Sequence, residues 1–485
     1  MIILKFGGTS VGDALRVRDA AAIVALQPSP RVVVVSAASG VTNALLESAR
    51  AAAGGDLDRA AGAGATIHDR HRNVADAVPD GAERAAVRAE LATLHARLDE
   101  ALAEVRGAGL LSDRLSDRIV ATGEKAMSIC FAAYLRAAGQ PASHVFADRV
   151  VGTDDRHGNA RLDRARTRAQ AHEVIRPLLD AGQTVVVTGF IGAAPDGGTT
   201  TLGRGGSDYS ATILGAALDA DEVQIWTDVP GVLSADPRQV KGARVVPVIS
   251  YDEAQELAHF GAKVLHPRTI RPAVARDIPV RILSTFAPRE PGTVVTKQAV
   301  GTRVKAVTAL RGLILLTVDV PELEDLTGAA AVAFGVLHAE GAEVAFAAQG
   351  SSRRRMTYLL DGVTGGCGRI GERLRAALHA LDDLDAEVAC TEDVALVAAV
   401  GAGAAGQPGT LGRMLDVLGQ AGIAVMAASQ QASNVAVVAA VSAADADRAV
   451  EVLHAALIPA SEPPAPPSRR RTRRADLLGE SLRVG

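Results

Sequence analysis

Five short, predominantly apolar runs in the first 298 residues constrain the fold of this chain most strongly. They are Ile2–Phe6, Val32–Val35, Val185–Ile191, Val223–Trp226 and Val280–Leu283. Continuous rather than alternating hydrophobicity is typical of strands covered on both faces, as in a parallel sheet wrapped by helices. Alanine-rich stretches with helical spacing separate the runs, and residues 44–110 contain no strand candidate. The sequence therefore predicts a layered α/β domain over residues 1–298, with a helical insertion at 44–118.

An internal repeat marks the second part of the chain, from about residue 305 to 458. Residues Val336, Leu337, Gly341, Val344, Gln349 and Ser352 recur 81 positions later as Val417, Leu418, Gly422, Val425, Gln430 and Ser433. Each copy is expected to form a strand, a helix, two strands and the turns between them, over about 310–385 and 392–458, with interleaving open. Chance similarity in a chain rich in Ala, Val and Gly is the alternative. The Pro- and Arg-rich residues 459–485 are expected to be a disordered tail.

Charge and cysteine content exclude several classes of protein. The chain has 51 Lys and Arg against 55 Asp and Glu, a net charge of -4 that argues against a nucleic-acid binder. Cys130, Cys367 and Cys390 form no CxxC pair, so neither a disulfide framework nor a zinc site is indicated. No run of 18 apolar residues could span a membrane, and the start lacks the apolar stretch of a signal peptide. We expect a reduced, cytoplasmic protein without a metal site.

A glycine-rich motif, Lys5-Phe6-Gly7-Gly8-Thr9-Ser10, directly follows the first apolar run. Glycines at the end of a strand let backbone N–H groups converge on an anion, and the N-terminus of a following helix adds its positive dipole. Lys5 is one of only six lysines among the 51 basic residues. A lysine at this place can neutralise a phosphoryl group during its transfer. A tight turn between strand and helix would explain the glycines but not Lys5.

A second glycine-rich motif, Thr199–Asp208, has three glycines in four positions, followed by Ser207 and Asp208 before a helix expected near Tyr209. Such a loop also cradles anions. Arg204 within it has the fork geometry that captures a carboxylate or a phosphate. We expect both loops to lie at the carboxyl ends of parallel strands and to share one ligand crevice.

Two further motifs and one acidic residue have open interpretations. Thr227 and Asp228 follow an apolar run, with Arg238 beyond them and Lys263 in the segment FGAKVLHP. These side chains could surround a nucleotide, but each motif alone is equally typical of a turn with a salt bridge. Glu124, in Thr-Gly-Glu, could hold an ammonium group or be an acid near a helix N-terminus that the dipole stabilises.

Taken together, these segments resemble the aspartokinases of the amino acid kinase superfamily over about residues 2–458. The matching segments are KFGGTS (5–10), SAASGVTN (36–43), TGE (122–124), GFIG (189–192), TTTLGRGGSDYSA (199–211), WTDVPGV (226–232), ADPR (235–238) and FGAKVLHP (260–267). The resemblance implies a three-layer αβα sandwich followed by two ferredoxin-like βαββαβ ACT domains. Residues 223–298 look especially like the kinase half of bifunctional aspartokinase–homoserine dehydrogenases, but we expect a monofunctional enzyme because the chain has no room for a dehydrogenase.

The resemblance also implies a reaction and its residues. ATP would phosphorylate the side-chain carboxylate of L-aspartate, giving 4-phospho-L-aspartate, the first step towards lysine, threonine and methionine. ATP would be a substrate, with Mg²⁺ bridging its phosphates. Lys5 and Asp208 would be catalytic, and aspartate would contact Thr42, Glu124, Arg204 and Ser207. ATP would contact Lys5, Gly7, Gly8, Thr9, Ser10, Thr227, Asp228, Leu233, Arg238, Lys263 and Val264. Leu233 stands where the family usually has a tyrosine.

Regulation through the ACT domains is implied as well. An amino-acid effector, threonine ranked slightly ahead of lysine, would contact Gln349, Ser351 and Gln430, and the ACT domains would pair in a homodimer or homotetramer. Arginines at 353–355 follow the first polar turn and could have replaced this regulation with a fixed interface. Two other functions remain open: an amino acid kinase for glutamate, acetylglutamate or UMP, and a catalytically silent amino-acid sensor.

Overall fold

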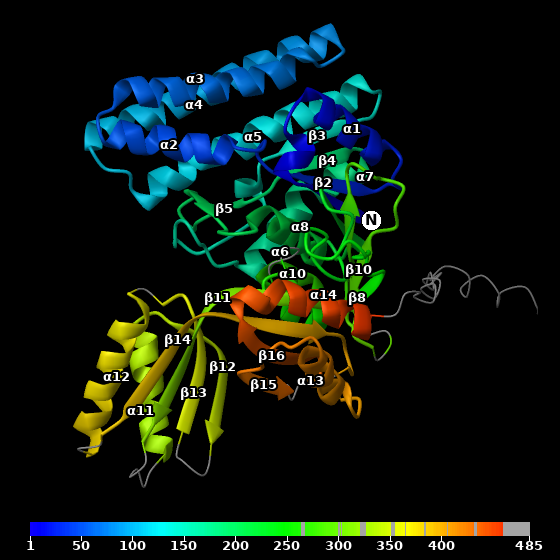
Figure 1. The fold of residues 1–485 in the computed structure, drawn as a ribbon. Helices are drawn as coiled ribbons and strands as arrows, with labels where there is room; N and C mark the ends of the chain where they lie inside the picture. The colour runs from blue at the N-terminus through cyan, green and yellow to red at the C-terminus, as the bar shows by residue number, and fades with distance from the viewer. Residues whose placement is uncertain are drawn as a thin grey trace, which may run out of the picture.

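The computed structural model describes residues 1–262, 267–298, 301, 303–320, 326–350, 355–363, 365–382, 385–404, 406–430 and 434–458. The expected tail at 459–485 lies outside these residues. Figure 1 shows two sheets with their helices, the N-terminal part of the chain above and the C-terminal part below.

The N-terminal sheet is the parallel sheet that the apolar runs predict. Its strands are β1 (Ile2–Phe6), β2 (Arg31–Val35), β3 (Ala142–Val145), β4 (Thr184–Thr188), β7 (Glu222–Thr227), β8 (Val248–Ser250), β9 (Val280–Ser284) and β10 (Thr293–Thr296). They are ordered β3-β4-β2-β1-β7-β9-β10-β8, and only the β9–β10 pair is antiparallel. The predicted run Val185–Ile191 is not one strand: it covers β4 and the start of β5 (Ile191–Ala193), because Phe190 turns the chain at a φ of 69°.

Helices cover both faces of this sheet, which confirms the three-layer sandwich. On one face lie α1 (Ala14–Ala25), α2 (Val41–Ala53) and α5 (Asp113–Ala137); on the other lie α6 (Arg164–Val174), α7 (Arg176–Asp180), α8 (Gly206–Ala217), α9 (Tyr251–His259) and α10 (Pro267–Val274). Strand β2 explains the continuous hydrophobicity. Val33 and Val35 pack in the core on the α1 face of the sheet, and Val32 and Val34 pack in the core on the α8 face, so every position of the strand is buried.

The long alanine-rich stretch is helical. After α2 come α3 (Leu57–Asp76) and α4 (Gly81–Ala108), which lie beside each other at the top of Figure 1. Their apolar residues join the core on the α1 face of the sheet, Ile67 from α3 and Leu91 and Leu98 from α4 among them.

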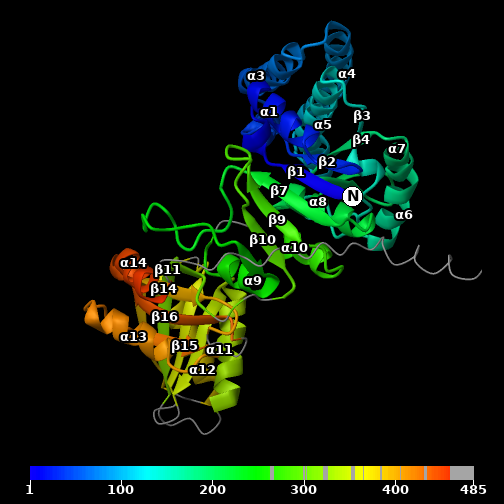
Figure 2. The same ribbon diagram turned by 90° about the vertical axis from the view of Figure 1, so that its right-hand side faces the viewer.

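The C-terminal sheet is antiparallel and holds both copies of the repeat. Its strands are β11 (Ala306–Asp319), β12 (Glu343–Gly350), β13 (Arg355–Asp361), β14 (Glu387–Val400), β15 (Ala427–Gln430) and β16 (Ala436–Ser442), ordered β12-β13-β11-β14-β16-β15. Its helices are α11 (Leu326–Ala339), α12 (Gly366–Asp382), α13 (Thr410–Gln420) and α14 (Ala446–Leu457). The long strands β11 and β14 form the centre of the sheet and pair from end to end, with register shifts between Leu310 and Leu315. Figure 2 shows the C-terminal elements below the N-terminal ones in a second view.

Contacts between the two sheets involve buried polar groups. Lys305 Nζ, just before β11, lies 2.8 Å from a carboxylate oxygen of Glu253 on α9 and donates to the Val248 carbonyl oxygen. Ala235 and Val240, which follow β7 in the sequence, pack in the core beneath β14 and β16 rather than in either core of the parallel sheet. The segment after β7 is therefore held by the C-terminal sheet.

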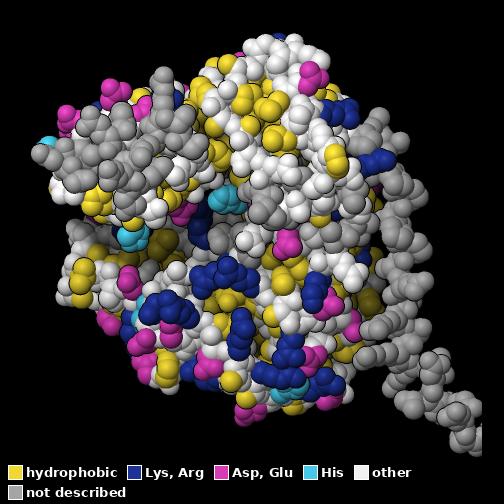
Figure 3. Space-filling model, turned by 90° about the horizontal axis from the view of Figure 1, so that it is seen from below, with side chains coloured by type: hydrophobic (Ala, Val, Ile, Leu, Met, Phe, Trp, Pro, Cys, Tyr) yellow, Lys and Arg dark blue, Asp and Glu magenta, His cyan; other side chains and the backbone are white. Residues whose placement is uncertain are grey.

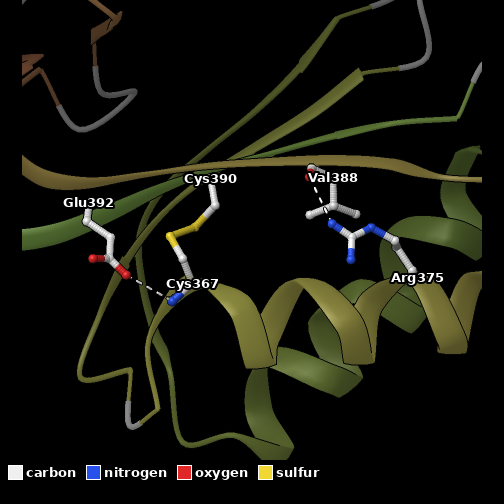
Figure 4. Close-up of a disulfide and its surroundings, with 5 residues drawn as sticks. All are labelled: Cys367, Arg375, Val388, Cys390 and Glu392. Carbon is white, nitrogen blue, oxygen red and sulfur yellow. Dashed lines mark hydrogen bonds between the residues drawn. A yellow bond between two sulfur atoms is a disulfide. The ribbon is translucent and has the colours of Figure 1, made fainter.

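A disulfide joins Cys367, at the start of α12, to Cys390 on β14 (Figure 4). The two Cα atoms are 5.8 Å apart although 23 residues separate the cysteines. The expectation that no disulfide forms is wrong, because the packing of α12 on β14 brings together two cysteines that show no motif. Cys130 is buried and free.

Charges of both signs are mixed on the underside of the molecule. Figure 3 shows Lys and Arg side chains lying among Asp and Glu there. None of the described helices combines the length and the apolar character needed to cross a membrane.

Candidate active site

A cavity of about 570 Å³ lies where β1, β2, α5 and the start of α8 meet. It brings together seven of the predicted site residues: Lys5, Gly8, Thr42, Glu124, Arg204, Ser207 and Asp208. Parallel strands end at one edge of a sheet, so residues far apart in the sequence meet there. The structure thus places the predicted catalytic and aspartate-binding residues around one space.

Lys5 and Asp208 form an ion pair inside this cavity. Lys5 lies on β1 and Asp208 in the first turn of α8, and Nζ is 2.6 Å from Oδ1. Only 8% of Lys5 is exposed. Asp208 therefore holds the ammonium group in one place, where it can face an anion that enters the cavity.

Glu124 is a buried carboxyl group with one oxygen that has no hydrogen-bond partner. It lies in the middle of α5, so the interpretation as an acid near a helix N-terminus is excluded. Oε1 accepts a hydrogen bond of 3.1 Å from the Ala37 N–H, whereas Oε2 is buried without a hydrogen-bond partner. Burial raises the pKa of this carboxyl to about 8, against the opposing effect of the backbone hydrogen bonds. A cation at Oε2 would reverse that shift.

Gly123 makes this position of Glu124 possible. A Cβ atom on residue 123 would lie 2.7 Å from Cβ of Ala37 and 3.2 Å from Val41. Without a side chain there, α5 approaches the loop after β2 closely enough for the hydrogen bond to Ala37.

The second glycine-rich loop is built differently from the prediction. It follows β6 (Thr199–Thr201), which pairs with β5 in a small antiparallel sheet, so it does not follow a strand of the parallel sheet. The loop nevertheless reaches the same cavity, because it leads into α8, whose first residues Gly206, Ser207 and Asp208 line that cavity. Arg204 is exposed at the cavity rim, and no ion pair to it forms among the described residues.

Of the predicted nucleotide residues, Lys5 and Gly8 line the cavity, whereas Gly7, Thr227, Asp228 and Arg238 are not among its lining residues. The Gly7 N–H donates to the Trp226 carbonyl oxygen at 3.1 Å, so the first glycine loop adjoins Thr227 and Asp228 at the end of β7. Arg238 is engaged in a bidentate ion pair with Asp236.

Several other nucleotide candidates have different environments. The Ser10 hydroxyl is buried and lies 2.6 Å from the Thr285 hydroxyl, whereas Thr9 is exposed. Leu233 is half-buried and forms an isolated antiparallel β-bridge with Val245. Lys263 and Val264 lie outside the described residues.

Comparisons with known proteins agree with this geometry. Residues 1–284 match the amino acid kinase family, and residues 397–457 match the ACT domain. Lysine-sensitive aspartokinase 3 of Escherichia coli (strain K12) is 38% identical over 339 residues, which are 70% of this chain and 73% of that protein. The chain belongs to the aspartokinases.

Two further comparisons give similar matches. The chloroplastic bifunctional aspartokinase/homoserine dehydrogenase 1 of Zea mays is 33% identical over 73% of this chain, a match that spans 39% of the maize protein. The crystal structure of E. coli aspartokinase III in complex with aspartate and ADP (R-state) is 32% identical, covers 95% of this chain and 100% of its own, and superposes with a TM-score of 0.76.

This aspartokinase has cavity residues that the sequence interpretation did not single out. Ser39, Asn43 and Phe190 line the cavity. Ser39 and Asn43 lie in the matching segment SAASGVTN, so a signal for them was present. Arg70 on α3 is not among the lining residues but donates a hydrogen bond of 2.6 Å to the carbonyl oxygen of Ser39, and no motif indicated it.

The predicted effector residues do not meet within one aspartokinase chain. Gln349 lies on β12 and Gln430 on β15, which form the two opposite edges of the C-terminal sheet. Both side chains are exposed. Ser351 lies outside the described residues.

Proposed function

We propose that this chain is an aspartate kinase, which transfers the γ-phosphoryl group of ATP to the side-chain carboxylate of L-aspartate. The observation that carries the proposal is the Glu124 carboxyl, buried in the cavity wall with one oxygen unpartnered. The α-ammonium group of an amino acid would satisfy that oxygen and stabilise its ionised form. Arg204 at the rim offers its guanidinium fork to a carboxylate of the same molecule.

The chemistry needs positioning and charge neutralisation. The side-chain carboxylate of aspartate has an ordinary pKa near 3.9, so at neutral pH it is already ionised and needs no general base. One of its oxygens bonds to the γ-phosphorus as the bond to the β–γ bridging oxygen breaks, and ADP leaves. Lys5, held by Asp208, neutralises charge on the group in transit.

ATP would bind beside this cavity, with its phosphates at Gly7 and Gly8 and its nucleoside near Thr227 and Asp228. The adjacency of the first glycine loop to the end of β7 supports this placement. Among the described residues, no group of three or more His, Cys, Asp or Glu side chains is placed to hold a metal ion. Mg²⁺ would bridge the phosphates of the nucleotide, as in phosphoryl transfer generally.

Regulation by an amino acid is part of the proposal. A relative 38% identical is named lysine-sensitive, and E. coli aspartokinase III was also solved with lysine and aspartate in a T-state. These names favour lysine ahead of threonine. Because Gln349 and Gln430 lie on opposite edges of one sheet, a site that combines such residues requires a second copy of the chain, which supports an oligomer through the ACT domains. We place the enzyme in the cytoplasm.

Substrate analogues test the proposed function. ATP consumption is measured with L-aspartate, L-glutamate, N-acetyl-L-aspartate and N-acetyl-L-glutamate. Only L-aspartate should support rapid turnover, because an acetylated nitrogen cannot neutralise Glu124. Equal turnover of N-acetyl-L-aspartate, or a preference for either glutamate compound, would overturn the assignment.

A further inference from the structure

Asp117 is a buried carboxylate next to the active site that does not line the cavity. Only 2% of it is exposed, and it lies on α5, the helix that carries Glu124. Seven residues, or two helical turns, separate the two acids, so they lie on the same side of α5. Glu124 faces the cavity, and Asp117 contacts the β5–β6 hairpin next to it.

Five hydrogen-bonding contacts fill both oxygens of Asp117. Oδ1 accepts from the Thr201 hydroxyl at 2.6 Å, and Oδ2 accepts from the Thr201 N–H at 3.1 Å. The Gly158 N–H donates to both oxygens, at 3.1 Å and 2.9 Å, and His157 Nδ1 lies 3.0 Å from Oδ2. Four groups make these five contacts, since the Gly158 N–H is shared by both oxygens, and a carboxylate presents about four lone pairs to accept them.

These contacts fix the residues that lead directly into the second glycine loop. Thr201 ends β6, and its carbonyl oxygen accepts from the Ala160 N–H at 2.8 Å. Gly203 has a φ of 77°, and a Cβ there would lie 2.8 Å from Oδ1 of Asn159. Arg204 is the residue directly after Gly203 in the sequence. The loop that presents Arg204 is therefore held against residues 157–160, and Asp117 binds both sides.

We propose that Asp117 is a positioning residue for aspartate binding, a role that rests on the proposed function of the cavity. Through Asp117 and Glu124, a single rigid helix sets both ends of the substrate site: Glu124 at the ammonium end and, through Thr201, Arg204 at the carboxylate end. A glycine-rich loop has many accessible conformations, so Arg204 needs such an anchor to be preorganised.

The main test is steady-state kinetics of Asp117→Asn. An amide keeps the shape but turns an NH₂ group toward the donors on Thr201 and Gly158. The value of kcat/KM for aspartate should fall by about 10- to 100-fold, the loss expected for a misplaced binding group, while the KM for ATP changes less than about twofold. Asp113→Asn, an exposed acid one turn earlier on α5, is the matched control and should behave as wild type.

A second pair of variants covers the case in which Asp117→Asn fails to fold. Thr201→Val removes the hydroxyl donor and should raise the KM for aspartate several-fold, whereas Thr201→Ser keeps the hydroxyl and should restore it. An unchanged aspartate KM in folded Asp117→Asn, or in Thr201→Val, overturns the proposal. A parallel rise in the KM for ATP also overturns it, because a general loss of structure would explain that result.

Hydrogen exchange separates this proposal from the proposed function. The peptide spanning residues 199–206 should exchange faster in Asp117→Asn than in Asp113→Asn, whichever substrate the enzyme uses. If wild type does not phosphorylate aspartate, the proposed function fails, and unchanged exchange in this peptide would refute the positioning role as well. If wild type is active and the exchange rates of the two variants are equal, only the positioning role fails.

Discussion

Glu124 shows how a single residue can link substrate binding to pH. Its pKa is raised to about 8 in the free enzyme because burial disfavours the charge. Only the ionised form attracts the ammonium group of aspartate, so binding must displace a proton below that pH. We predict that kcat/KM for aspartate rises with pH up to about 8 and then levels, as a pH profile would reveal. In Glu124→Gln this ionisation should vanish and the KM for aspartate should rise at every pH, with the KM for ATP little changed.

Lys5 acts on the transition state more than on the bound substrate. Its ammonium group is held in the cavity by Asp208 and meets charge that grows as the phosphoryl group moves. We predict that Lys5→Ala lowers kcat by about 10²- to 10³-fold, as for loss of one preorganised donor, with a small effect on the KM for aspartate. Lys241→Ala, at an exposed position, is the control. A near-normal kcat for Lys5→Ala would make Lys5 a turn residue.

Functional residues could be predicted from the sequence only where they belong to a motif. KFGGTS, TGE and LGRGGSD gave Lys5, Glu124, Arg204 and Asp208, which meet in the cavity. The environment of each residue could not be predicted. The unpartnered Oε2 of Glu124 and the five contacts of Asp117 arise where segments far apart in the sequence approach each other. Phe190 lies in the matching segment GFIG, but its positive φ could not be predicted because it has no signature in composition.

Among the elements, the pair α3–α4 contains a cluster of three histidines, and the pKa of His71 within it is strongly lowered in the folded chain. His71 is 1% exposed, with Nδ1 3.0 Å from Nε2 of His95, and His68 stacks on His95. Burial first, and the neighbouring histidines second, lower the pKa of His71 to about 3. The folded state thus favours neutral His71, so its stabilising effect is complete above about pH 6.5 and is lost as the pH falls below that value.

Stability measurements at two pH values test this cluster. Between pH 6.5 and 5 the free energy of unfolding should fall by about 2 kcal/mol on account of His71, from the conversion of pKa shifts to free energy. Urea denaturation of wild type and of His71→Phe provides the measurement. The variant should lose this part of the pH dependence. An identical pH dependence in both proteins would mean that His71 does not contribute.

Elements were predictable where burial was uniform along them. The apolar runs predicted β1, β2, β4, β7 and β9, since strands covered on both faces are predominantly apolar. Strands β3, β8 and β10 have only three or four residues each and show no such run. The repeat predicted the strand–helix–strand–strand order of each copy but not the helices α12 and α14 that follow. It also did not predict the assembly of both copies into one sheet, which depends on pairing between the long strands β11 and β14.

At the scale of the whole molecule, the C-terminal sheet holds a segment that follows a strand of the catalytic sheet. Ala235 and Val240 pack under β14 and β16, and Ser234 contacts His454 on α14 at 2.8 Å. A ligand that favours one arrangement of the C-terminal sheet can therefore act on the neighbourhood of Leu233 and Arg238. Such coupling between sites is typically about 1–3 kcal/mol.

Inhibition by amino acids tests this coupling. We predict that millimolar lysine lowers activity at sub-saturating aspartate, and that threonine does so less. Gln349→Ala should weaken the inhibition without altering activity in the absence of effector, since Gln349 is exposed on β12, away from the cavity. If neither amino acid inhibits the wild type, the ACT domains have a structural role only.

Product trapping with hydroxylamine tests the central claim, that this chain phosphorylates the aspartate side chain, most directly. An acyl phosphate reacts with hydroxylamine to give a hydroxamate, which is measured together with ADP. The account predicts aspartate hydroxamate and ADP in equal amounts, dependent on both L-aspartate and ATP, and reduced in Glu124→Gln at the same sub-saturating aspartate concentration. ADP formation that does not require aspartate, or that yields no hydroxamate, would contradict it.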